Sequence, residues 1–338
     1  MLQKISLGVK DIDKYRFLLA SELFDEIDSL AGELKGLRLC HINSTPFGGG
    51  VAELLFSYIP MVRSLGIHAD WQVIRGDRRF FTITKCLHNA LQGAPYPLLE
   101  QATQRVYLSN NQSNARELDP DYDVFVINDP QPAALRYFCE GMQAKWIWRC
   151  HVDSSEPDEE AWQFLRPYIE EYDAAVFTKS DFVPPDLKGP RIAIMPPAID
   201  PLSTKNMPLP KAEVCKSMLD NLGLHKDRPL IVQVSRFDRW KDPFGVINVF
   251  RLVREKVPGV QLALVGSLAN DDPEGWELYA AIHEEADKYE DAHVFSNLNG
   301  VGNMEVNAFQ TASDAVSYTH LRAHETRHDL VCRLLLEK

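Results

Sequence analysis

Two basic residues, Arg236 and Lys241, provide the strongest chemical signal in this 338-residue sequence. The apolar run Leu230 to Val234 before them predicts a buried strand, and the apolar spacing of Phe244 to Val257 predicts a helix after them. Both cations would then lie in a strand-to-helix turn, where open α/β sheets bind ligands. A guanidinium holds two phosphate oxygens at once and an ammonium adds a compact charge, so the pair suits a diphosphate. The alternative is a solvated loop, the commoner fate of an isolated Arg-x4-Lys.

Three consecutive glycines, Gly48, Gly49 and Gly50, lie between a predicted strand, Leu37 to Ile42, and a predicted helix, Val51 to Leu65. Because glycine has no β-carbon, backbone N–H groups in this turn can approach an anion at the positive end of the helix. The run lacks the full G-x-G-x-x-G pattern, so a tight turn without a ligand explains it equally well.

A carboxylate and an amide, Asp129 and Gln131, follow a strand predicted at 124–128. Pro132 suits the first turn of a helix, so the first expectation for Asp129 is that it caps that helix. The alternative is that both side chains contact a ligand at the carboxyl edge of the sheet.

His151 and Asp153 follow another predicted strand, 146–149, at the same edge. A histidine there can hydrogen-bond a sugar hydroxyl, and the neighbouring carboxylate can fix its tautomer. A single histidine is more often structural. Four loops of this kind on one edge agree with each other, and this agreement favours a ligand site more than any single motif does.

Alternating strands and helices must position these loops, and the apolar periodicity predicts them. The alternation indicates a mostly parallel, doubly wound sheet, followed by a proline-rich break and a hinge with one short helix at 211–222. A second α/β series begins at 230, so we expect an α/β fold of two Rossmann-like domains facing a cleft. The other expected strands are Ala69 to Ile74, Ala174 to Thr178, Arg191 to Met195, Gln261 to Val265 and Ala292 to Phe295. The other expected helices are Tyr15 to Leu34, Glu274 to Tyr289 and Glu305 to Ala312.

Composition restricts the class of protein. Hydrophobic residues make up 45% and charged residues 25%, as in ordinary soluble proteins. With 36 basic and 48 acidic residues, the net charge of -12 argues against nucleic-acid and anionic-membrane partners. The sequence shows no apolar signal core and no run long enough to span a membrane, so the expected compartment is the cytoplasm. A homodimer is the default expectation for its assembly, because dimers are the commonest soluble homo-oligomers. Reduced, mostly buried thiols without a C-x-x-C pair are expected at Cys40, Cys86, Cys139, Cys150, Cys215 and Cys332.

Several stretches together resemble the retaining, nucleotide-sugar-dependent glycosyltransferases of family four, which have the GT-B fold. Within that family they are most similar to the trehalose-forming glycosyltransferring synthases. The stretches cover nearly all of residues 35 to 314. The matching stretches are 41–53, 84–93, 128–134, 146–153, 194–201, 234–241 and 271–276.

The resemblance implies an enzyme that transfers glucose from a nucleoside-diphosphate glucose to glucose, forming trehalose with retained configuration. Arg236 and Lys241 would hold the donor diphosphate and stabilise charge on the departing nucleotide, and His151 would contact a sugar. The likeness implies no built-in cofactor, with magnesium expected only as a companion of the nucleotide sugar. The substrate-binding residues that it implies are Gly48, Gly49, Gly50, Asp129, Gln131 and Asp153.

The resemblance also divides the chain into an acceptor domain at 1–200, a partial nucleotide-sugar domain at 201–315 and a tail at 316–338. After Asp314 a relative would continue into a strand and a glutamate-rich loop and helix that hold the donor. Codons that spell residues 316–326 and 330–338 instead resemble sequencing-adapter DNA, so residues 316–338 are expected to be translated adapter sequence. We therefore expect a truncated chain with an incomplete second domain and little or no activity.

Four alternatives remain at this stage. His324 and His328 complete an H-E-x-x-H pattern, the helical zinc site of metalloproteases, although the adapter origin of the tail argues against it. A trehalose phosphorylase of the same fold would place inorganic phosphate at Arg236 and Lys241. The other two are an α-glycosyltransferase with another acceptor and a sugar-binding protein without activity.

Overall fold

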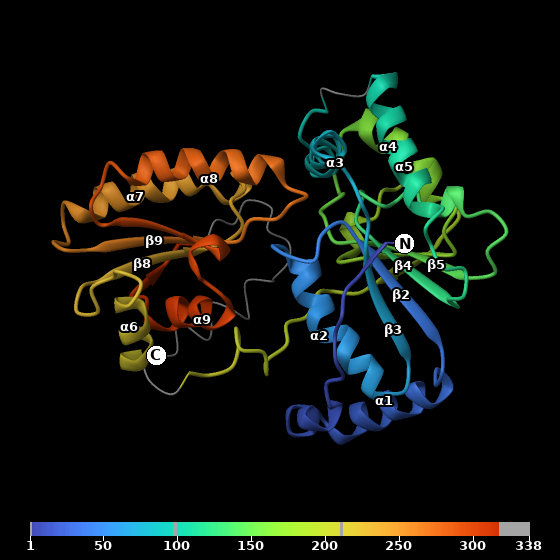
Figure 1. Ribbon diagram of the computed structural model, residues 1–338, viewed down its shortest axis with the longest axis horizontal. Helices are drawn as coiled ribbons and strands as arrows, with labels where there is room; N and C mark the ends of the chain where they lie inside the picture. Colours follow the sequence, from blue (N-terminus) through green and yellow to red (C-terminus); the bar gives the residue numbers. More distant parts are fainter. Residues whose placement is uncertain (1, 97–99, 210–211, 318–338) are drawn as a thin grey trace. The chain divides into compact units, whose positions relative to one another are not determined.

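The computed structural model describes residues 2–96, 100–209 and 212–317 (Figure 1). These residues form two compact units. The first comprises 2–46 and 50–198, and the second comprises 47–49 and 199–317. Each unit has its own sheet and its own hydrophobic core.

The first unit is built on a seven-stranded sheet with the order β1-β3-β2-β4-β5-β6-β7. All neighbouring strands are parallel except β1, which pairs antiparallel with β3. The strands are β1 (Gln3–Lys4), β2 (Arg38–Asn43), β3 (His68–Val73), β4 (Val124–Asn128), β5 (Lys145–Cys150), β6 (Ala174–Phe177) and β7 (Arg191–Ile194). The helices are η1 (Ile12–Leu18), α1 (Ser21–Glu33), α2 (Gly50–Ser64), α3 (Arg78–Leu91), α4 (Gln101–Ala115), η2 (Arg136–Phe138), α5 (Glu159–Ile169) and η3 (Ser180–Phe182).

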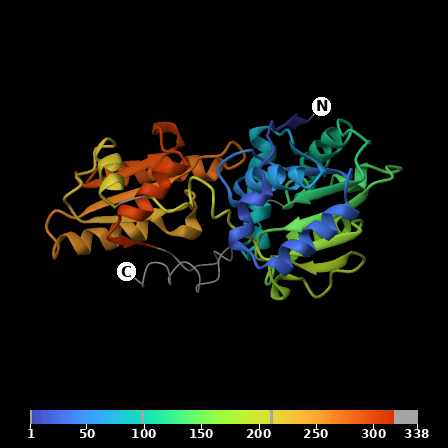
Figure 2. The same ribbon diagram turned by 90° about the horizontal axis from the view of Figure 1, so that it is seen from below.

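Alternate residues of the first sheet face two different helical layers. Leu39 and Val126 pack with the apolar residues of α2, whereas Cys40 and Ile42 pack with those of α3 and α5. The turned view shows helices around this sheet from a second side (Figure 2). Strand order reverses at β2, which lies between β3 and β4, and doubly wound sheets bind ligands beside such a switch point.

The second unit has a four-stranded sheet with the order β10-β9-β8-β11, and all its pairs are parallel. Helices α7 and α8 cover one face of β8 and β9, and α6 and α9 cover the other (Figure 1). The strands are β8 (Leu230–Val234), β9 (Gln261–Gly266), β10 (Ala292–Ser296) and β11 (Ala315–Val316). The helices are α6 (Ala212–Asp220), η4 (Arg239–Lys241), α7 (Pro243–Arg254), α8 (Pro273–Ala286), η5 (Asn297–Asn299) and α9 (Asn303–Ala312).

The predicted α/β class is confirmed, and strands β4 and β8 have the predicted bounds. Three expectations about these elements were wrong. The single helix expected from Tyr15 to Leu34 is divided into η1 and α1. Turns rather than an α-helix follow Pro132. The short strand β11 lies directly after Asp314, where the chain was expected to lack a strand. Most of the expected non-native tail and the His324–His328 motif lie outside the described residues. Among the helices that the structure describes, none is long and apolar enough to cross a membrane.

Candidate active site

Arg236 and Lys241 lie between β8 and α7, in the strand-to-helix turn predicted for them. The short helix η4 shapes this turn, and its N-cap Asp238 accepts a hydrogen bond from the Trp240 N–H at 2.9 Å. The Lys241 carbonyl accepts from Nε2 of Gln233, inside β8, at 2.7 Å. The backbone that carries the lysine is therefore tied to the strand.

A buried carboxylate accompanies the first cation. Asp238 is 1% exposed, and its Oδ2 lies 3.5 Å from Nη2 of Arg236. This ion pair orients the guanidinium and offsets part of its charge. Arg239, a third cation in the turn, pairs with Glu274 at 3.7 Å. The sequence analysis did not identify Asp238, although an acid two residues after the arginine was a usable signal.

The entry into α7 depends on an unusual residue conformation. Asp242 has a left-handed backbone with a φ of 45°, and its side chain accepts from the Gly245 N–H at 3.0 Å as the N-cap of α7. A β-carbon on Gly245 would overlap the carboxylate of Asp242. Glycine at this position therefore permits the cap, which fixes the residue that follows Lys241.

The glycine run has the predicted strand–loop–helix order, because β2 ends at Asn43 and α2 begins at Gly50. Gly48 has a φ of 78°, a conformation that favours glycine. Gly49 has open space where a β-carbon would be added. The glycines thus add no side chain to the end of this loop, as an anion-binding turn requires.

Asp129 joins the carboxyl ends of β4 and β5. Its backbone N–H donates to the Arg149 carbonyl at 2.9 Å, and its Oδ1 accepts from the His151 N–H at 2.8 Å. Its φ of 65° is rare for a residue other than glycine, and such strain concentrates at functional sites. The expected role as a helix N-cap was wrong, because the next helix is η2, whose N-cap is Leu135.

The contacts of His151 determine its tautomer. Its Nε2 lies 3.0 Å from Oδ1 of Asn128, whose Nδ2 donates to the carbonyls of Ile42 and Val126 at 3.0 and 3.3 Å. Since the amide nitrogen faces two acceptors, Oδ1 must face the imidazole, and Nε2 must donate to it. The lone pair of His151 is therefore on Nδ1, where it can accept a hydroxyl proton.

Burial and a nearby positive charge keep the two histidines of this region neutral. Burial, and then the positive charge of Arg149, lower the pKa of His41 to about 3. Burial, Arg149 and His41 lower the pKa of His151 to about 3 as well. Both rings are thus neutral at ordinary pH. Burial also lowers the pKa of Arg149, while the nearby phenol group of Tyr58 and the negative charge of Asp129 oppose this shift.

Two other predicted site residues have clear local roles. Asp153 is buried, and its Oδ1 accepts from the backbone N–H and the hydroxyl of Ser155 at 3.0 and 2.6 Å, which shapes the loop after β5. The Gln131 carbonyl accepts from Nδ2 of Asn111 at 3.2 Å. The buried Oε1 of Gln131 has no hydrogen-bond partner within the described ranges.

The structure also adds residues that the sequence analysis did not select. Asn128, Arg149 and His41 surround His151, as the hydrogen bond to Asn128 and the mutual charge effects indicate. The first two end predicted strands, so their position at the carboxyl edge was available as a signal. His41 falls inside a strand and carried none.

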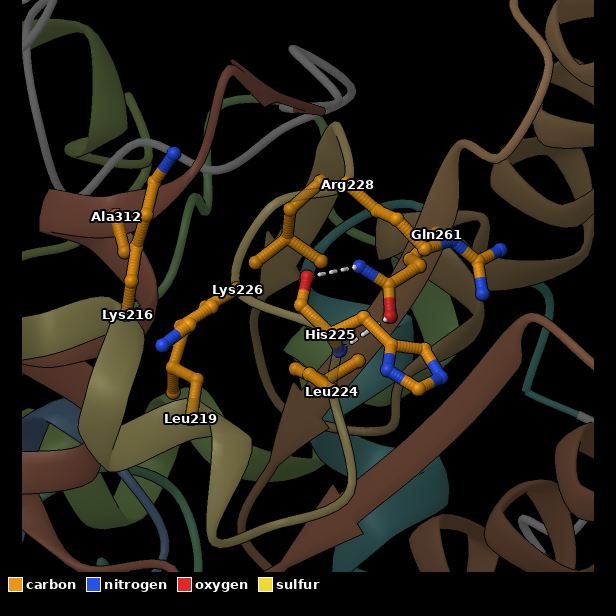
Figure 3. A pocket seen from close by; sticks show the side chains of 9 residues that line it. Lys216, Leu219, Leu224, His225, Lys226, Arg228, Gln261 and Ala312 are labelled. Atoms are coloured by element: carbon orange, nitrogen blue, oxygen red, sulfur yellow. Dashed lines mark hydrogen bonds between the residues drawn. The ribbon is translucent and has the colours of Figure 1, made fainter. Parts of the chain in front are cut away.

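A small recess lies at the other edge of the second sheet (Figure 3). It is lined by Leu230 and Gln261, which begin β8 and β9, whereas Arg236 follows the carboxyl end of β8. The Gln261 side chain bonds the backbone N–H and carbonyl of His225 at 2.8 and 2.9 Å. The recess has a volume of about 10 Å³, enough for roughly one water, so it is too small to bind a sugar.

No group of metal ligands was found in the described part of the chain.

Known proteins that this chain resembles have names that refer to trehalose. A family model described as trehalose synthase, N-terminal domain, matches residues 41–184. The trehalose synthase of Rubrobacter xylanophilus is 44% identical over 327 residues, which are 95% of this chain and 78% of that protein. The trehalose phosphorylase of Pleurotus pulmonarius is 27% identical over 81% of this chain and 43% of that protein. A solved trehalose 6-phosphate synthase from Burkholderia multivorans has the same fold, with a TM-score of 0.59, 14% identity and coverage of 84% and 78%.

Proposed function

The chain belongs to the trehalose synthase family, and from this premise we propose that it transfers glucose from a nucleoside-diphosphate glucose to glucose, forming trehalose with retained configuration. The observation that carries the proposal is the 44% identity to a trehalose synthase over 95% of the chain. The chain is thus a trehalose-related glycosyltransferase of the GT-B fold. The donor class, the acceptor and the stereochemistry are the proposed part.

The donor diphosphate would be bound by Arg236 and Lys241. In the reaction, the bond between the anomeric carbon and the phosphate oxygen breaks, and negative charge grows on the departing nucleotide. Cations fixed in advance stabilise this charge more in the transition state than in the ground state. The pair of Arg236 with Asp238 and the tie between Lys241 and Gln233 support such preorganisation. Magnesium would enter with the nucleotide sugar.

The acceptor glucose would lie at the carboxyl edge of the first sheet. A neutral His151 with its lone pair on Nδ1 can accept the proton of a sugar hydroxyl in a hydrogen bond, and Asp129 fixes the His151 backbone. The attacking hydroxyl oxygen would bond to the anomeric carbon on the face that the nucleotide leaves. Its proton would pass to the departing diphosphate, which balances the reaction.

A phosphorylase is the second candidate, because trehalose phosphorylases are 27% identical over 81% of the chain. In that reaction inorganic phosphate would occupy the site of Arg236 and Lys241, and trehalose would be cleaved to glucose 1-phosphate and glucose. The lower identity makes it the weaker proposal. Both candidates use the same cations, so only substrate dependence separates them.

The test supplies the purified chain with glucose and ADP-, UDP- or GDP-glucose, and separately with trehalose and phosphate. Chromatography measures trehalose and nucleotide, and calorimetry measures binding of each substrate. We expect donor binding that competes with the free nucleoside diphosphate. We also expect that any trehalose formed, even at the low activity expected of this chain, requires a nucleotide sugar and has the α,α linkage by NMR. Turnover that needs phosphate would favour the phosphorylase. Binding of neither nucleotide sugar nor glucose would contradict both.

A further inference from the structure

Arg149 differs from other partly buried arginines of the chain in its partners. The side chain of Arg63 donates to the Ala69 carbonyl at 2.6 Å and pairs with Asp70 at 3.1 Å. Arg228 likewise has a carbonyl and a carboxylate. The guanidinium of Arg149 makes no hydrogen bond or ion pair with any residue that the structure describes. A half-buried cation without partners among the described residues is costly unless water or a ligand supplies acceptors.

A buried histidine beside Arg149 also lacks hydrogen-bond partners among the described residues. His41 is 3% exposed, and neither of its ring nitrogens has a hydrogen-bond partner in the ranges that the structure covers. Its ring meets the edge of Tyr58, on α2, at 5.3 Å between centroids. Most buried polar groups in proteins are paired, so the two unpaired ring nitrogens of His41 beside the Arg149 guanidinium indicate a polar ligand.

The strand register places these groups on one face of the first sheet. His41 pairs with Val126 across β2 and β4, and Asn128 pairs with Arg149 across β4 and β5. Val126 and Asn128 are two residues apart, so they point to the same face, and Val126 packs against α2 on that face. His41, Asn128, Arg149 and the ring of His151 therefore gather where β2, β4 and β5 end.

The balance of charge selects the class of ligand. Arg149 contributes one positive charge, and Asp129 contributes a negative charge close enough to counteract the shift in the pKa of Arg149. His41 and His151 are neutral. A phosphate would be repelled by Asp129 and would find only one cation. A hydroxyl both donates and accepts, so a site with a guanidinium, a carboxylate and neutral imidazoles fits a polyol.

We infer that Arg149 contacts the accepting hexose, donating its N–H groups to sugar hydroxyls, with His41 as a neutral positioning residue behind it. This inference rests on the proposed function, which places a neutral hexose at this edge. The inference adds Arg149 to the acceptor site, for which the proposed function names only Asp129 and His151. The planar guanidinium suits two adjacent hydroxyls, so Arg149 selects the acceptor by the position of its hydroxyl groups.

The experiment measures glucose binding to the full chain by calorimetry and by saturation-transfer NMR. Arg149→Met should weaken glucose binding at least tenfold, because hydrogen bonds from a charged group are lost. Arg149→Lys should restore part of this loss. Binding of ADP-glucose should remain within twofold of the wild type. The control Arg191→Gln removes an exposed arginine from β7 of the same sheet and should change neither affinity.

Deoxyglucoses make the test specific. The wild type should bind at least one monodeoxyglucose much more weakly than glucose, and Arg149→Met should bind the two equally. A folded Arg149→Met with wild-type glucose affinity, or equal loss of glucose and nucleotide binding, would overturn the inference and leave the proposed function standing. If the methionine variant does not fold, Arg149→Lys with an unchanged deoxyglucose pattern would overturn it. Absence of glucose binding by the wild type would overturn the proposed function and the inference together.

Discussion

At the scale of single residues, Arg236 is the most exacting test of the donor site. Arg236→Ala should weaken binding of the nucleoside-diphosphate glucose by about ten- to a hundredfold, because a charge-assisted contact contributes roughly 1.5–3 kcal/mol. Calorimetry with the nucleotide sugar measures the change. Arg239→Ala, in the same turn but paired with Glu274, is the matched control and should leave the affinity unchanged. Equal losses in the two variants would mean that the turn acts only through its total charge.

A second residue-scale prediction concerns His41 and pH. Burial lowers the pKa of His41 to about 3, whereas the unfolded chain has the ordinary value near 6.5. Between these values the unfolded state binds a proton that the folded state excludes, so stability falls as the pH drops below 6.5. The free energy of unfolding of the wild type should fall between pH 6.5 and pH 5.5. The fall in His41→Phe should be smaller by about 1 kcal/mol.

Urea unfolding at the two pH values measures this difference. His68, exposed at the start of β3, provides the control variant His68→Phe, which should keep the wild-type dependence. An identical pH dependence for His41→Phe and the wild type would show that His41 is protonated in the folded chain, contrary to the buried neutral ring described above.

The residues of the site were predictable where chemistry coincides with the end of a strand. Arg236 and Lys241 follow a strong apolar run, so their place in a turn was readable from spacing alone. Arg149 was not selected although it ends a predicted strand. His41 was not selected because a polar residue within a strand usually points to solvent or has a partner. They lie close together because of the register across β2, β4 and β5, and the sequence of a single strand does not determine that register.

At the scale of the element, the α7 N-terminus connects stability with the donor site. Gly245→Ala would push away the Asp242 carboxylate that caps α7, so the free energy of unfolding should fall by about 1 kcal/mol. Donor affinity should fall too, because Asp242 directly follows Lys241. Gly32→Ala is the control and should have the opposite effect. Gly32 lies in α1 with open space where a β-carbon would be added, so alanine should stabilise the helix by roughly 0.5–1 kcal/mol.

Chemical denaturation and calorimetry on both variants check this pair. Stabilisation by Gly245→Ala would mean that the cap contributes nothing. An unchanged donor affinity in a destabilised Gly245→Ala would separate the cap from the position of Lys241.

Periodicity predicted most elements, and the exception after Asp129 has a structural cause. The stretch with Pro130 and Pro132 seemed to begin a helix, yet its backbone forms turns. Two buried tyrosines explain this, because the hydroxyl of Tyr107 donates to the Pro130 carbonyl at 2.7 Å and that of Tyr172 donates to the Ala133 carbonyl at 2.8 Å. An α-helix would use those carbonyls itself. Partners distant in sequence decided the local structure, and local spacing carries no record of them.

At the scale of the whole molecule, the net charge of -12 contrasts with the basic donor turn. An acidic protein repels polyanions in general, so the proposed donor diphosphate would be held by local cations rather than by the overall field. The affinity for the donor should therefore depend only weakly on the salt concentration, because few charges contribute to binding.

The two units also predict a division of labour in ligand binding. Each has its own core, and the proposed donor turn belongs to the second unit while the proposed acceptor edge belongs to the first. A ligand stabilises what it binds by RT ln(1 + [L]/Kd), about 2.7 kcal/mol at a hundred times Kd. Hydrogen exchange should show that a nucleoside diphosphate slows exchange at 234–245, whereas glucose slows it at 128–131 and 149–153. Protection at the first-unit segments by the nucleotide alone, with 234–245 unaffected, would reverse the assignment of donor and acceptor to the two units.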